Sequence, residues 1–177
     1  MSDDFVQRMR NTAHLGRDFL TWLWFKSDSQ EGLVKVGEES ATAEIWFTDR
    51  IVLSAHGDAP ERVAVSTEDP SGNAEARTGL RQGKKVDQAR LQIVKGQREW
   101  LVTVKGETLA LGGIKIPELL TREEDDRIRE RLLLLDQLDS LIHSLFQKFM
   151  VIRNDNKSWD ETSQAMAVWI NSPIQAR

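Results

Sequence analysis

The 177-residue sequence contains no cysteine and only three histidines. Without cysteine the chain has no disulfide, no thiolate nucleophile and no cysteine-based zinc or iron–sulfur site. The motifs H-E-x-x-H and G-x-S-x-G and a glycine loop ending in G-K-[ST] are missing too. The start of the chain, MSDDFVQRMR, lacks the pattern of a signal or transit peptide, and no apolar run is long enough to span a bilayer. These absences predict a cytoplasmic protein that is not an enzyme and makes no membrane contact.

Residues that could bind a metal or transfer protons are scattered along the chain. His14, His56 and His143 show no i, i+4 pairing and have no carboxylate motif beside them. The acidic run at residues 123–126 can be read as a set of metal ligands. Acids in the first turn of a helix, however, stabilise the helix dipole without any metal. We therefore predict no catalytic residue, no metal site and no cofactor.

The composition is that of an ordinary globular protein, with 40% hydrophobic and 29% charged residues. This balance predicts a single α+β domain over residues 1–177. Within it, residues 1–14 are expected to form a loosely ordered N-terminal segment, and residues 153–177 a C-terminal helix and tail.

The densest aromatic cluster lies in the segment LGRDFLTWLWFKS, which we predict as part of a helix over residues 3–25. The helix contributes four rings at close spacing, from Phe19, Trp22, Trp24 and Phe25. Such rings bury large apolar areas, so a core anchor is the first interpretation and base stacking the alternative.

Two sets of strands are predicted from the period-two alternation of apolar residues. The first set comprises residues 33–36, 43–47, 51–55 and 63–66. Residues 48–50 are read as a hairpin turn between two of these strands. The second set, a three-stranded antiparallel meander, comprises residues 90–94, 100–105 and 108–111. A short amphipathic helix with a basic exposed face is expected between the two sets, within residues 71–85. On the meander, Trp100 alternates with valines and is assigned to the core in preference to base stacking.

A long helix to about residue 152 is the clearest element of the C-terminal part. Thr121 and Glu124 have the spacing of a capping box at its start. Its apolar residues recur at steps of three and four: Ile128, Leu132, Leu135, Leu138, Ile142, Leu145 and Phe149. This stripe indicates either core packing or a subunit interface, for which we name Leu135, Ile142 and Phe149. A second capping box over residues 158–161 predicts a last helix that ends before Pro173.

Charge is distributed unevenly along the chain. The formal net charge is −4, but residues 77–115 carry nine bases and three acids and therefore +6, which leaves −10 for the rest. This asymmetry favours an anionic partner for one face, although solvated strand edges are the simpler alternative. The candidate DNA phosphate contacts are Arg77, Arg81, Lys84, Lys85, Arg90, Lys95 and Arg98. On this hypothesis, Lys84→Ala/Lys85→Ala lowers salt-sensitive, nonspecific binding to duplex DNA.

The order of these segments resembles the C-terminal half of the recombination-associated protein RdgC family. The matching words are FLTWLWFKS, then TGLRQGKKVDQARLQIVKGQREWLVTVKGETLALGGIKIPELL, then RERLLLLDQLDSLIHSLFQKF. The resemblance covers residues 15–150 and implies a shortened relative of a non-enzymatic DNA-binding protein. In that family the protein forms a ring-like dimer around duplex DNA and limits access of the RecA recombinase. It further implies a nucleoid-associated homodimer, with Gly83-Lys84-Lys85 at the DNA.

A second hypothesis assigns the chain to a different class. It is a protein-interaction module, for instance one encoded by a phage, whose long helix forms an oligomer or binds a recombinase or nuclease. An enzyme of unknown type is a third and weaker alternative.

Overall fold

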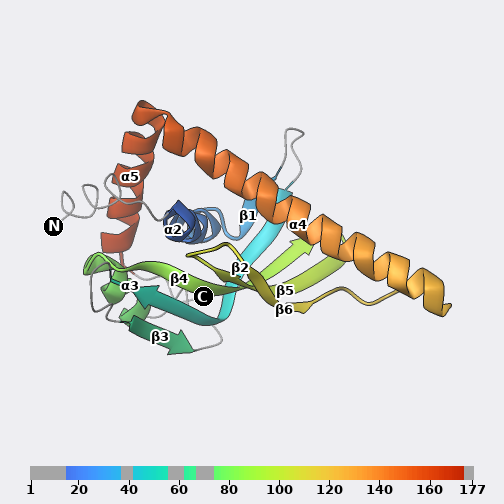
Figure 1. The fold of residues 1–177 in the computed structure, drawn as a ribbon. Helices are drawn as coiled ribbons and strands as arrows, with labels where there is room; N and C mark the ends of the chain where they lie inside the picture. The colour runs from blue at the N-terminus through green and yellow to red at the C-terminus, as the bar shows by residue number, and fades with distance from the viewer. Residues whose placement is uncertain (1–14, 37–41, 56–61, 67–73, 174–177) are drawn as a thin grey trace.

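The computed structural model describes residues 15–36, 42–55, 62–66 and 74–173. It confirms a mixed α+β fold with an antiparallel six-stranded sheet (Figure 1). The strands are β1 Leu33–Lys35, β2 Thr42–Ser54, β3 Arg62–Ser66, β4 Lys85–Lys95, β5 Arg98–Lys105 and β6 Leu111–Lys115. The helices are α2 Leu15–Ser29, α3 Ala74–Arg81, α4 Glu124–Asn154 and α5 Asn156–Asn171. Residues 1–14, where the aromatic helix was expected to begin and where His14 lies, fall outside the described residues, as does His56.

Both predicted strand sets join in one sheet, with the order β1-β2-β4-β5-β6 and β3 paired to β2. The meander β4-β5-β6 is confirmed, but its last strand is Leu111–Lys115 and not residues 108–111. The reason is a longer turn after β5. Leu109 adopts a left-handed backbone, and the Lys105 amide donates to the carbonyl of Ala110, so residues 108–110 still belong to the turn.

The predicted hairpin turn at residues 48–50 is wrong, because β2 runs through it as one strand of 13 residues. Phe47 pairs with Leu91 and Ile51 pairs with Ala89. Between these two pairs β2 advances by four residues, whereas β4 advances by only two. The two extra residues form a bulge, in which Asp49 takes a positive φ of 55°. A bulge of even length keeps Phe47 and Ile51 on the same face of the sheet.

The helices lie on one face of the sheet, with α2 between the sheet and the pair α4 and α5 (Figure 1). A helix between two layers must be apolar on all sides, and this explains the aromatic density of α2. Phe19 and Trp22 contact Phe149 of α4, while Trp24 contacts Phe47 of β2. The core interpretation of the aromatic cluster is therefore confirmed.

Neither predicted capping box is present as such. At the start of α4 the N-cap is Glu123, whose side chain makes no cap hydrogen bond. The hydroxyl and amide of Thr121 instead donate to the carboxylate of Glu130. Helix α5 begins a turn earlier than expected, because the Asp155 side chain accepts from the Ser158 amide. Both helices otherwise match the predicted extents.

Candidate functional site

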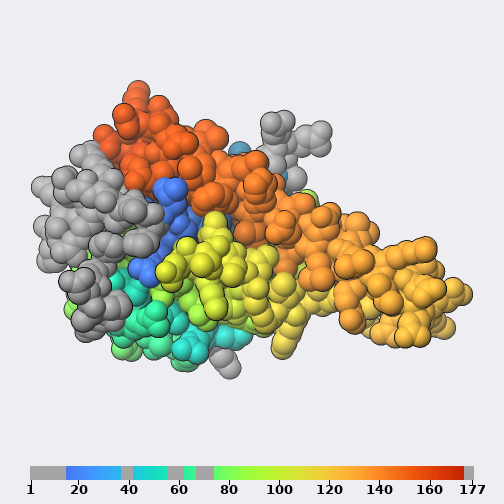
Figure 2. Space-filling model, in the orientation of Figure 1, coloured from blue at the N-terminus to red at the C-terminus, as the bar shows by residue number. Residues whose placement is uncertain are grey.

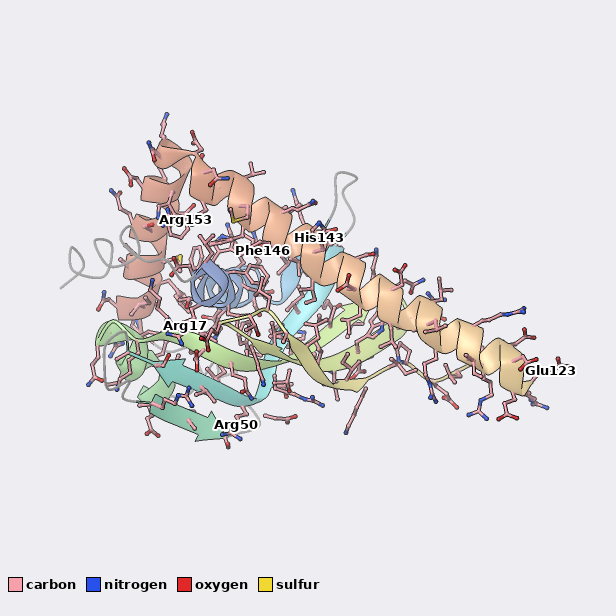
Figure 3. The ribbon with its side chains drawn as sticks, in the orientation of Figure 1. Arg17, Arg50, Glu123, His143, Phe146 and Arg153 are labelled. Atoms are coloured by element: carbon pink, nitrogen blue, oxygen red, sulfur yellow. The ribbon has the colours of Figure 1, made fainter. Side chains whose placement is uncertain are left out.

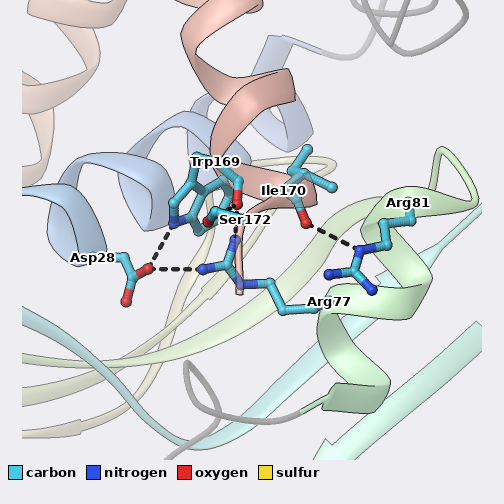
Figure 4. Close-up of polar contacts among 6 residues, drawn as sticks. All are labelled: Asp28, Arg77, Arg81, Trp169, Ile170 and Ser172. Carbon is cyan, nitrogen blue, oxygen red and sulfur yellow. Dashed lines mark hydrogen bonds and ion pairs between the residues drawn. The ribbon is translucent and has the colours of Figure 1, made fainter. Parts of the chain in front are cut away.

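Arg77, a predicted DNA contact, lies in the interior at the end of α5 (Figure 4). Its Nη1 donates to the Trp169 carbonyl at 2.8 Å, and its Nη2 pairs with Asp28 Oδ2 at 2.9 Å. The guanidinium also stacks 3.9 Å from the centre of the Trp169 ring. Burial lowers the pKa of Arg77, and the charge of Asp28 opposes that effect. Arg77 thus joins α2, α3 and α5 and does not face solvent.

Arg81, one turn further along α3, is exposed but also contacts α5. Its Nε donates to the Ile170 carbonyl at 3.1 Å (Figure 4). A cation at the C-terminal end of a helix is stabilised by the helix dipole and by the carbonyls that lack intrahelical partners. Of the predicted basic face of α3, one arginine is therefore buried and the other caps a helix.

Lys84 and Lys85 are buried too, which contradicts the surface role predicted for Gly83-Lys84-Lys85. The Lys85 ammonium pairs with Asp18, a carboxylate with no exposed surface, and Arg153 Nε lies 4.0 Å from the same carboxylate. Burial lowers the pKa of Lys85, while the charge and hydrogen bond of Asp18 raise it. Lys84 donates to Gln82 Oε1 at 3.3 Å. Loss of DNA binding in Lys84→Ala/Lys85→Ala would therefore reflect an unpaired buried carboxylate as readily as a lost phosphate contact.

Two of the three predicted interface residues are core residues. Ile142 and Phe149 are buried against the body of the protein, and Leu135 is partly buried. Phe149 packs among Phe19, Trp22 and Trp159. The C-terminal half of the stripe thus covers α2, and it is not available to a second subunit.

The N-terminal part of α4 projects beyond the sheet and carries exposed apolar side chains. We call residues 120–133 the arm; Figure 2 shows the orange end of α4 extending past the body, and Figure 3 places Glu123 at its tip. Its large apolar residues and their exposed fractions are Leu120 84%, Ile128 56%, Leu132 61% and Leu133 52%. The sequence showed the stripe, but not the point at which the sheet stops covering it.

The second feature is the sheet face opposite the helices, which we call the open face. One cross-strand row on it runs from Trp46 through Gln92 and Leu101 to Lys115. Trp46 is half-buried and packs over Gly32, where an added Cβ would lie 2.3 Å from the ring. Sequence reasoning missed Trp46, although its alternation with the buried Ile45 and Phe47 places it on this face.

Exposed cations lie on part of the open face: Lys105 of β5, opposite Gln88, and Lys115 of β6, opposite Leu101. Lys95 and Arg98 alternate onto the other side of the sheet, where Arg98 Nη1 donates to Gln137 Oε1 of α4. Arg90 lies within the face and donates to Thr103 Oγ1 and to the Gly113 carbonyl. Glu44 and Glu99 are exposed there as well, so the charge is mixed.

Of the seven predicted DNA contacts, the structure places only Arg90 on the open face, because Lys95 and Arg98 lie on the helix side of the sheet. Arg81 lies beyond the opposite end of β4, an 11-residue strand, and is therefore about 30 Å away along the sheet.

The described residues give no support to metal binding, histidine-based catalysis or insertion of a helix into a membrane. No group of three His, Cys, Asp or Glu side chains in them is placed to hold a metal ion. His143 is exposed and pairs with Gln147 on its own helix. None of the described helices combines the length and apolar character needed to cross a membrane.

Comparisons of the chain with protein-family models, curated proteins and solved structures find no match.

Proposed function

We propose that the protein binds DNA without reading its sequence, and that the open face is the contact surface. The observation that carries this proposal is the open face itself, a broad strand surface on which no described helix packs and which has Trp46 within it and cations along its β4–β6 side. Proteins that hold nucleic acid in this way combine Lys and Arg contacts to phosphates with aromatic rings on which bases stack.

The resemblance to the RdgC family supports the same proposal, because its longest matching word covers β4, β5 and β6. On this proposal the protein modulates recombination by occupying DNA and performs no catalysis. The net charge of −4 makes binding weak at physiological salt and strong only when salt is low.

The test is a fluorescence-anisotropy titration of labelled duplex and single-stranded DNA over a range of salt concentrations. The three cations of the open face, Arg90, Lys105 and Lys115, give a slope of log K against log salt of about −2.7 for the duplex when all three contact phosphates. Removing two of them in Lys105→Ala/Lys115→Ala makes the slope shallower by about 1.8. Trp46→Leu weakens single-strand binding and leaves duplex binding unchanged if the indole stacks on bases.

The matched control is Lys157→Ala, because Lys157 is an exposed lysine of α5, on the opposite side of the sheet. It should bind DNA like the unmodified protein, apart from a small change that any loss of charge produces. No binding at low salt would contradict the proposal, and so would equal losses in the control and the open-face variants.

A second candidate function, assembly, is favoured by the arm. We propose that two copies of the chain pair antiparallel through Ile128, Leu132 and Leu133, whose side chains are more than half exposed. Burying such side chains in a partner stabilises the complex by about 1.5–3 kcal/mol each.

The charge pattern of the arm selects the antiparallel orientation. Its N-cap and first turn hold four acids at residues 123–126. Residues 127–131 hold three arginines and one acid, Glu130, which accepts from the Leu120 and Thr121 amides. Antiparallel pairing places the acids of one copy beside the arginines of the other, whereas parallel pairing places like charges together.

Sedimentation velocity tests this assembly. The unmodified protein should be dimeric at micromolar concentration, and Ile128→Ser/Leu132→Ser should be monomeric. The control is Val168→Ser, because Val168 is an apolar residue on α5 that is 72% exposed. A monomeric unmodified protein would overturn the homodimer and leave a recombinase or nuclease as the partner to seek. A dimeric arm variant would show that the subunits meet elsewhere.

A further inference from the structure

A cavity of about 670 Å³ lies on the helix side of the sheet, between α2, β1 and α4. Helix α2 lines it with Trp22, Lys26 and Gln30, which are spaced one turn apart. Helix α4 forms the facing wall with residues between 144 and 152, and β1 closes one end. Its volume is within the range of pockets that bind small molecules.

Three lysines from three different elements meet at this cavity. They are Lys26 of α2, Lys35 of β1 and Lys148 of α4, and none of the lining residues that the structure describes is acidic. Lys148 Nζ donates to the Lys35 carbonyl at 2.8 Å. The cavity therefore concentrates positive charge that no carboxylate from the described part of its wall offsets.

Lys26 is the most unusual of the three. Its ammonium lies 5.4 Å from the centre of the Phe25 ring, and within the described residues it has neither a hydrogen bond nor an ion pair. Burial lowers the pKa of Lys26. An anion that approaches a half-buried ammonium without an ion-pair partner stabilises it, because the ammonium has already lost part of its hydration on folding.

The rest of the lining is largely apolar. Val34, Val151 and Ile152 contribute aliphatic surface, and Trp22 contributes an aromatic ring that is 3% exposed. The indole N–H of Trp22 has no acceptor among the described residues. That N–H is closed to solvent, so Trp22 contributes apolar ring surface to the wall and no polar contact.

We propose that this cavity binds a small amphipathic anion, with a carboxylate or phosphate head at the lysines and an apolar body against Trp22 and the aliphatic wall. The proposal does not depend on DNA binding or assembly. Lys26 and Lys148 lie on the helix side of the sheet and outside the arm, so substituting them leaves both the open face and the arm intact.

Isothermal titration calorimetry with ligands that share one chain length tests the proposal. The probes are decanoate, decyl phosphate, 1-decanol and decyltrimethylammonium, each below its micelle concentration. One of the two anions should bind with a stoichiometry of one and about tenfold more tightly than the alcohol, and the cation should bind least. Comparing decanoate with decyl phosphate shows which head group the lysines prefer.

Lys26→Met/Lys148→Met should weaken anion binding about tenfold while leaving 1-decanol binding unchanged, since methionine keeps the length of the apolar stem. Lys157→Met is the control and should bind as the unmodified protein does. Thermal melts of both variants show whether they remain folded. Equal affinity for all four head groups, no binding of either anion, or unchanged anion binding in the double variant would each overturn the proposal.

Discussion

At the scale of single residues, the interior of this protein holds formal charges that are stabilised by pairing. Asp18 is fully buried and has Lys85 as its ion-pair partner, with Arg153 nearby. Taking a charge out of water costs several kcal/mol, and only a well-placed opposite charge offsets this cost. Removing one partner is therefore more damaging than the weak net stabilisation of such a pair suggests.

We predict that Lys85→Ala lowers the free energy of unfolding by about 3–5 kcal/mol, because it leaves the Asp18 carboxylate without its nearest cation. Urea denaturation followed by circular dichroism measures the change. Lys105→Ala removes an exposed lysine from the neighbouring strand and should change stability by no more than about 0.5 kcal/mol. If both variants lower the free energy of unfolding by the same small amount, Arg153 alone is sufficient to stabilise the Asp18 carboxylate.

Asp155 gives the start of α5 a defined pH dependence. Hydrogen bonds from the side chain and amide of Ser158 lower the pKa of Asp155 below its usual 3.8. Because the folded pKa is the lower one, the cap stabilises the fold fully above pH 3.8 and loses this effect as the pH falls through the folded value.

We therefore predict that Asp155→Asn reduces the loss of thermal stability between pH 5 and pH 2.5, since asparagine caps a helix without titrating. Melting temperatures of the two proteins at both pH values provide the measurement. Identical losses in the two proteins would show that the Asp155 cap makes no contribution to the acid response.

The sequence identified the basic residues but could not tell paired ones from exposed ones. Lys85 and Asp18 are 67 positions apart, and Arg77 and Trp169 are 92 apart. A run such as Lys84-Lys85 has the same composition whether it binds phosphate or a buried carboxylate. Only the packing of α2 and α5 onto the sheet decides between the two.

At the scale of elements, the first turn of α2 lies directly against the turn that follows β5. A Cβ added at Gly16 would be 2.0 Å from the Gly106 carbonyl oxygen, far inside van der Waals contact. The neighbouring atom belongs to the backbone, so it cannot move aside as a flexible side chain would. This contact sets the distance between α2 and the edge of the meander.

We predict that Gly16→Ala destabilises the protein by about 1–3 kcal/mol, even though alanine is the better helix former. The matched control is Gly112→Ala in β6, where an added Cβ meets nothing within 4 Å. Thermal and urea denaturation of the two variants give the comparison. A more stable Gly16→Ala protein would mean that α2 can shift away from the turn at little cost.

Most elements could be predicted from local patterns, because α4 and the meander have clear periodicity. The bulge in β2 could not, since Thr48-Asp49-Arg50 has the composition of a hairpin turn. What distinguishes the two is β4, which pairs with β2 on both sides of these residues. The partner strand decides, and it lies about 40 positions further along the chain.

At the scale of the whole molecule, the fold separates its exposed features by direction. The open face lies on one side of the sheet and the helices lie on the other, while the arm extends from one end (Figure 1). A surface for an extended polyanion and a surface for a second copy can therefore be used at the same time. The sequence could not show this division, because open-face and helix-facing residues alternate along each strand, and the arm belongs to the same apolar stripe as the covered part of α4.

If the arm joins two copies, each dimer carries two open faces, and DNA long enough to reach both is held more tightly than by one. Linking two sites converts the second contact into an intramolecular one and raises the apparent affinity by about 10²-fold or more. We predict that Ile128→Ser/Leu132→Ser, which leaves the open face unchanged, weakens binding to a long duplex but not to a duplex that fits a single copy. Anisotropy titrations with the two duplexes, at a protein concentration where only the unmodified chain dimerises, provide the measurement. Equal losses on both duplexes would place the arm in direct contact with DNA, and no loss on either would mean that the two open faces do not engage one duplex together.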